Sequence, residues 1–124
     1  MNYDQARTYL LGRPESWEDY PFGPGIAVFK ISGKMFATLG SDAGVARMNL
    51  KCDPDEAVML RDIFDGVKPG YHMNKRHWNT VLLDNSVPRG EVERLIDNSY
   101  ALVVQGLPSK ERKALQRRTG QVIK

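Results

Sequence analysis

The sequence contains little cysteine, no long apolar segment and no secretory signal. Its one cysteine, Cys52, cannot form an intramolecular disulfide, which excludes a disulfide scaffold and agrees with a reducing compartment. No apolar run approaches the roughly 20 residues needed to span a bilayer, and residues 1–5 lack a basic segment followed by an apolar one. We therefore expect a cytoplasmic protein that does not associate with membranes.

Residues able to carry catalysis or bind a metal are few and widely spaced. His72 and His77 are five residues apart, so a strand places them on opposite faces and a helix does not bring them together. Cys52 precedes a helix start, which favours a thiolate, but the adjacent carboxylate of Asp53 disfavours it. Gly23-Pro24-Gly25 lacks the Lys-Ser/Thr of a phosphate-binding loop. We expect no metal, no cofactor and no enzymatic activity.

The positive charge of the chain is concentrated at its C-terminus. The 124 residues, 41% of them hydrophobic, suit one domain spanning 1–124, which we expect to be a monomer, and the net charge is +3. Residues 107–124 alone carry +5, from Lys110, Arg112, Lys113, Arg117, Arg118 and Lys124 against one acid. This basic segment is either a surface that attracts phosphate or simply a solvated helix face.

Periodicity predicts an α+β fold. We expect helices over residues 3–12, 54–64 and 88–103, a final helix from Ser109, and strands over 27–31, 34–39, 45–51, 67–71 and 78–83. Residues 13–25 are expected to be an ordered loop whose aromatic rings pack on the domain. The order α-βββ-α-ββ-α plus an extra C-terminal helix predicts a two-layer sandwich, with an antiparallel sheet and helices on one face.

Strand alternation and helix caps give finer predictions. In the strand over 45–51, Ala46, Met48 and Leu50 should face the core, leaving Arg47, Asn49 and Lys51 on a polar face. Asp53 should cap the next helix, with Glu56 reaching back, and Ser109 should cap the last one. The predicted buried residues of the two main helices are Ala57, Leu60, Ile63 and Phe64, and Val92, Leu95, Ile96, Ser99 and Val103.

The segment from Gly70 to Val81 is the densest in functional side chains. His72, Asn74, Lys75, Arg76 and His77 favour a loop that contacts phosphate, and Tyr71 or Trp78 could stack on bases. Arg47 and Lys51 would add to this surface if their strand face lies beside the loop. The alternative is a plain turn followed by a core tryptophan.

Five separated blocks resemble, in order, the MmcQ/YjbR-like family. They are Pro21-Phe22-Gly23, Gly33-Lys34-Met35-Phe36-Ala37, Asn49-Leu50-Lys51-Cys52-Asp53-Pro54, the segment from Gly70 to Val81, and Ser99-Tyr100. The resemblance implies a CyaY-like, frataxin-type α/β sandwich. It also implies the DNA-binding "double wing" role by which members are commonly described, a statement about shape that brings no catalytic residues with it.

The leading hypothesis is a domain that contacts a polyanion, plausibly DNA, electrostatically and with little sequence preference. The candidate residues are His72, Asn74, Lys75, Arg76, His77, Arg47, Lys51, Lys110, Lys113 and Arg117. The alternative is a protein-interaction module, similar to a secretion chaperone, that receives a protein partner on the open sheet face or the 13–25 loop. An enzyme is the third hypothesis, and it would require a cleft with strongly perturbed pKa values.

Overall fold

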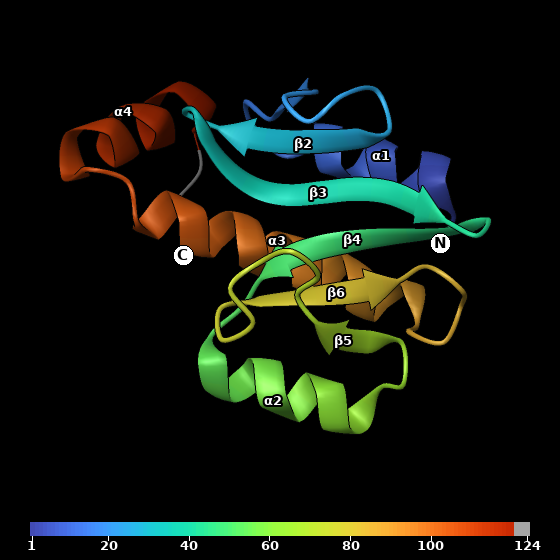
Figure 1. Cartoon of the computed structure of the whole chain (residues 1–124). Helices are drawn as coiled ribbons and strands as arrows, with labels where there is room; N and C mark the ends of the chain where they lie inside the picture. The colour runs from blue at the N-terminus through green and yellow to red at the C-terminus, as the bar shows by residue number, and fades with distance from the viewer. Residues whose placement is uncertain (121–124) are drawn as a thin grey trace.

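The computed structural model describes residues 1–120 and contains one six-stranded antiparallel sheet (Figure 1). Residues 121–124, which include Lys124 of the predicted basic segment and domain, lie outside the described residues. The strand order is β1-β2-β3-β4-β6-β5. The strands are β1 (Trp17–Asp19), β2 (Ile26–Ile31), β3 (Lys34–Asp42), β4 (Val45–Lys51), β5 (Val67–Pro69) and β6 (Trp78–Leu82).

Helices cover one face of the sheet and leave the other without a helical layer (Figure 1). The helices are α1 (Tyr3–Leu11), α2 (Pro54–Ile63), α3 (Arg89–Gln105) and α4 (Ser109–Thr119). α1 and α3 pack behind the central strands, α2 lies beside β5, and α4 follows α3 at one end of the sheet (Figure 1). The predicted α+β class, with an antiparallel sheet and an extra C-terminal helix, is confirmed.

The core lies between the sheet and α1 and α3. Leu10, Phe29, Phe36, Met48 and Ile96 are fully buried there. The alternation predicted for β4 is confirmed, since Ala46, Met48 and Leu50 are buried while Arg47, Asn49 and Lys51 stay half-exposed. Burial of apolar side chains on one face therefore fixes which face of the sheet is open.

The prediction that residues 13–25 are only a loop was wrong. Residues 17–19 form the edge strand β1, in which Trp17 pairs with Lys30 of β2. Three residues between turn-forming segments give no visible alternation, so the pairing comes from the available edge of β2. The expectation that the aromatic rings of this segment would be buried was also wrong, because Trp17, Tyr20 and Phe22 are 46%, 44% and 70% exposed.

The predicted helix caps and the end of α2 also need correction. Asp53 makes no side-chain cap hydrogen bond, and Glu56 instead accepts a hydrogen bond from Arg94 of α3 at 2.9 Å. α2 ends at Ile63, whose side chain is 64% exposed, and Phe64 is already extended. Ser109 is the first residue of α4, with Pro108 at the capping position. In these places an ion pair and a proline replace the capping hydrogen bonds that local sequence favours.

The Ser99-Tyr100 block joins α3 to the sheet. Ser99 is fully buried, and its hydroxyl donates to the carbonyl oxygen of Phe36 at 2.6 Å and accepts from the amide of Lys51 at 2.9 Å. The ring of Tyr100 packs edge-on against Phe36 with centroids 5.3 Å apart, and its hydroxyl donates to the carbonyl oxygen of Pro14. This block therefore fixes where β3 and β4 separate at one end of the sheet.

Candidate functional site

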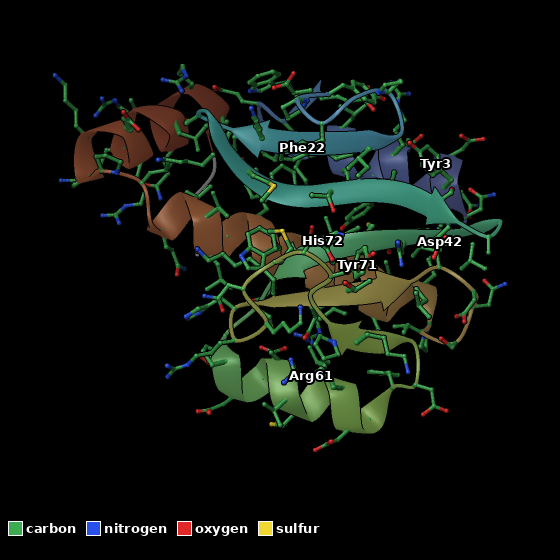
Figure 2. All side chains as sticks on the ribbon, viewed as in Figure 1. Tyr3, Phe22, Asp42, Arg61, Tyr71 and His72 are labelled. Carbon is green, nitrogen blue, oxygen red and sulfur yellow. The ribbon has the colours of Figure 1, made fainter. Side chains whose placement is uncertain are left out.

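Residues 70–77 form a loop that lies across the open face of the sheet, in front of β4 and β6 (Figure 2). The amide of Tyr71 donates to Oγ1 of Thr80 at 2.9 Å, and Nδ2 of Asn49 donates to the carbonyl oxygen of Tyr71 at 3.1 Å. The hydroxyl of Thr80 in turn donates to Oδ1 of Asn49. The polar face predicted for β4 therefore lies beneath the loop and anchors it.

The two ends of the loop are also held. A Cβ atom on Gly70 would lie 2.8 Å from the carbonyl oxygen of Trp78, so only glycine fits there without a shift. The ammonium group of Lys75 donates back to the carbonyl oxygen of Gly70 at 3.0 Å. Arg61 of α2, labelled in Figure 2, donates to the carbonyl oxygen of Lys75 and to Oδ1 of Asn79. The loop is thus tied to the sheet and to α2 before any ligand binds.

Removing the Asn49 amide should loosen this loop. We expect Asn49→Ala to lower the free energy of unfolding by about 1–2 kcal/mol, because it removes the hydrogen bonds to Tyr71 and Thr80. Urea unfolding measures this loss, and faster hydrogen exchange at the Tyr71 amide should accompany it. Asn98→Ala is the matched control, because no side-chain hydrogen bond of Asn98 exists within residues 1–120. Equal losses in the two variants would contradict this role of Asn49.

A groove of about 390 Å³ lies on the open face between this loop and the β2–β3 side of the sheet. Its apolar lining comes from Phe22, Ile26, Met35, Tyr71 and Met73, and its polar lining includes Arg47, Asn49 and His72. Phe22, Tyr71 and His72 are labelled on this face in Figure 2. The open face is therefore a mixed surface, more apolar than the polar face that the alternation in β4 predicts.

Tyr71 is the best-positioned aromatic side chain in the groove. Its ring is 52% exposed, with the guanidinium carbon of Arg47 4.6 Å from its centroid and the ring of His72 4.0 Å away. His72 has a φ of 58°, a left-handed conformation that is uncommon for a residue with a side chain. Arg47 also pairs with Asp42 at 3.5 Å. Neighbouring groups therefore hold an exposed ring in a defined position.

Most of the other predicted site residues gather at one end of the sheet. Lys51 ends β4 and pairs with Trp78, which begins β6. Asn74, Lys75 and Arg76 precede this point and are exposed, with the side chain of Asn74 accepting from the amide of Arg76 at 3.0 Å. His77 is half-buried, and its carbonyl oxygen accepts from the amide of Cys52 at 2.8 Å.

α4 lies at the same end of the sheet (Figure 1). Lys110, Lys113 and Arg117 are exposed on it, and Arg118 pairs with Glu15 just before β1. We use the name basic end for the residues at this end of the strands: Lys51, Asn74, Lys75, Arg76, His77, Lys110, Lys113 and Arg117. The predicted site residues therefore fall into two groups. Eight of them form the basic end, and the other two, Arg47 and His72, line the groove.

Sequence reasoning missed part of the groove and misplaced one aromatic residue. Phe22, Ile26 and Met35 come from segments far from residue 70, and only the β2–β3 register brings them together. Period-two alternation could have placed Ile26 and Met35 on the open face. Phe22 belongs to the first family block and to the 13–25 loop, but it lies outside any periodic segment, so no pattern assigns it to this face. The alternative that Trp78 is a core residue was wrong, since it is half-buried and lies opposite Lys51 outside the core.

Cys52 is poorly suited to act as a nucleophile. Its side chain is buried, and this burial, with the charges of Glu56 and Asp53, raises the pKa of the thiol to about 11. At pH 8 we expect iodoacetamide to modify Cys52 about 100-fold more slowly in the native protein than in urea, because little thiolate forms. Mass spectrometry of the alkylated protein measures the two rates. Similar rates would mean that the native thiol is accessible and ionised.

Two further features, a group of metal ligands and a membrane-spanning helix, are absent from the residues that the structure describes. Within residues 1–120, no three His, Cys, Asp or Glu side chains are grouped so that they could hold a metal ion. In the same range no helix has the length and apolar character needed to cross a membrane.

This architecture, a six-stranded sheet with helices behind and a loop tied across its front, defines a class of small α+β proteins. A model of the YjbR family matches residues 11–102, and the chain belongs to this family. It is 40% identical over 114 residues to the uncharacterized protein YbdF of Escherichia coli O157:H7, covering 92% of this chain and 93% of that protein. It is 30% identical over 115 residues to the uncharacterized protein YjbR of Escherichia coli K12, covering 93% and 98%.

Solved structures have the same fold. Protein DR2400 of Deinococcus radiodurans, assigned to domain family DUF419, superposes with a TM-score of 0.85 at 36% identity. That match covers 92% of this chain and 87% of the other. The crystal structure of a Pseudomonas syringae protein gives a TM-score of 0.71 at 34% identity, covering 80% and 96%. The family resemblance of the five blocks is therefore confirmed.

Proposed function

We propose that the protein binds a polyanion, with DNA as the first candidate, through the basic end. The observation that carries this proposal is a set of cations without acidic partners. Within residues 1–120, none of Lys51, Lys75, Arg76, Lys110, Lys113 and Arg117 forms a salt bridge, whereas seven other Lys and Arg side chains do. Cations from three segments at one end of a sheet create a local positive field that attracts phosphate.

The proposed binding is electrostatic and has little sequence preference. Lysine, arginine and asparagine side chains on a surface position a phosphate backbone without reading base edges. The role is binding and not catalysis, which agrees with the buried thiol of Cys52. The proposal places the protein in the cytoplasm as a monomer with no cofactor.

Titration of labelled DNA tests this function. Fluorescence anisotropy of single-stranded and duplex DNA at about 50 and 200 mM salt covers a range over which several phosphate contacts change affinity by orders of magnitude. We expect micromolar or tighter binding at the lower salt concentration and a steep loss at the higher one. Absence of binding to both forms at the lower concentration would contradict the proposal.

A second candidate function is recognition of a protein partner on the open sheet face. The apolar lining of the groove, with Phe22 70% exposed and Tyr71 52% exposed, favours this candidate. Such a complex would bury apolar side chains, so its affinity should change little with salt. Salt dependence therefore distinguishes the two candidates.

A further inference from the structure

We infer that the groove beside Tyr71 accepts an unpaired base of single-stranded nucleic acid while the basic end contacts the neighbouring phosphates. This inference rests on the proposed polyanion binding and specifies the form of the ligand. It follows from the position of the loop over residues 70–77, which contributes residues to both surfaces. Tyr71, His72 and Met73 line the groove, and the next four residues belong to the basic end.

The Tyr71 ring suits base stacking because it is both exposed and fixed. Hydrogen bonds to Thr80 and from Asn49 hold its backbone on each side, and Arg47 and His72 contact its ring. Ordering the loop therefore adds little entropy cost when a ligand binds. Exposed aromatic rings beside cations are the usual stacking surface for single strands.

The dimensions and lining of the groove also suit a flat ring. Its volume of about 390 Å³ lies within the range of about 300–1,000 Å³ that small-molecule sites occupy. Phe22, Ile26 and Met35 supply an apolar lining on the β2–β3 side of the sheet. The side chains of Ser41 and His72 line the groove and make no hydrogen bond within residues 1–120, so both can bond to a base edge.

Charge complementarity favours nucleic acid over an apolar peptide as the occupant. A groove with an exposed tyrosine, followed along the same loop by the exposed cations Lys75 and Arg76, matches a chain in which phosphates alternate with flat rings. A duplex fits less well, because its bases are already paired and stacked, and removing one costs a few kcal/mol. We therefore expect single strands to bind more tightly than duplexes of equal length.

Abasic oligonucleotides test the inference on the unaltered protein. A labelled strand of about 12 nucleotides and the same strand with abasic sites carry equal charge, so their affinities differ only through the bases. We expect anisotropy to give an affinity about 5- to 100-fold weaker for the abasic strand, about the fold-change that alanine substitution of a stacking aromatic side chain gives per base. Tyr71→Ala should weaken binding of the normal strand by a similar factor and have little further effect on the abasic strand.

Two matched variants complete the experiment. Tyr71→Phe keeps the ring and should recover most of the affinity that Tyr71→Ala loses. Tyr20→Ala removes a tyrosine of similar exposure, 44%, that does not line the groove, and should leave binding unchanged.

The inference and the function on which it rests fail in different ways. Equal affinity for the normal and abasic strands, with salt-dependent binding retained, would overturn the base-binding groove and leave polyanion binding intact. Absence of binding to any strand at about 50 mM salt would overturn both and shift attention to a protein partner.

Discussion

The variant Lys51→Ala/Arg76→Ala/Arg117→Ala should bind DNA about 100-fold more weakly than the unaltered protein at 50 mM salt. Each lost phosphate contact lowers the affinity because fewer counterions are released from the DNA on binding. It takes one cation from each of the three segments of the basic end, and none of the three forms a salt bridge within residues 1–120. The slope of log affinity against log salt should become shallower by about two to three. Anisotropy titrations over a series of salt concentrations measure both quantities.

Lys75 is left unchanged in this variant because its ammonium group also donates to the carbonyl oxygen of Gly70. Its loss would therefore mix an effect on the loop with an effect on charge. The control Lys68→Ala/Arg89→Ala removes two exposed cations outside the basic end, of which only Arg89 forms an ion pair within residues 1–120, with Glu93 at 3.7 Å. If the control weakens binding as much as the variant, net charge alone determines affinity and the basic end has no special role.

Ser99→Ala should lower the free energy of unfolding by about 2–4 kcal/mol, because two buried backbone groups lose their partner. The hydroxyl of Ser99 is the link between the carbonyl oxygen of Phe36 and the amide of Lys51, and the side chain is fully buried. An alanine methyl group can satisfy neither group, and the site is too enclosed for bulk water to replace the hydroxyl.

Urea unfolding of Ser99→Ala, compared with Ser41→Ala, measures this loss. Ser41 is exposed and makes no side-chain hydrogen bond within residues 1–120, so its substitution should change stability by less than about 0.5 kcal/mol. A loss below about 1 kcal/mol for Ser99→Ala would show that the strand ends need no bridging hydroxyl.

The fold was predictable wherever one face of an element is buried along its length. β4 alternates cleanly, and Val92, Leu95, Ile96, Ser99 and Val103 of α3 are all buried as the spacing predicts. β1 was not predictable, because three residues carry no period and the strand forms by pairing with an edge. The end of α2 was also missed, because the exposure of Ile63 depends on how the helix lies against β5.

The sequence predicted most residues of the candidate site, but it did not predict that they lie in two places, the groove and the basic end. The density of His72, Asn74, Lys75, Arg76 and His77 identified the loop, and its position over β4 brings Arg47 to the Tyr71 ring. Local sequence does not show that Asn49 and Thr80 turn this loop across the sheet. Without that turn, Tyr71, His72 and Met73 would not line the groove opposite Phe22. Only the tertiary structure therefore shows that the predicted site consists of a groove and a separate basic end.

Mapping of backbone amide shifts by nuclear magnetic resonance tests the location of binding most directly. Titration of the ¹⁵N-labelled protein with single-stranded DNA should shift the amides of Lys51, of residues 74–77 and of residues 110–117, together with those around Tyr71. The amides of α2 that face away from the sheet, such as that of Val58, should not move. Shifts confined to α2, or none at saturating DNA, would contradict binding at the basic end.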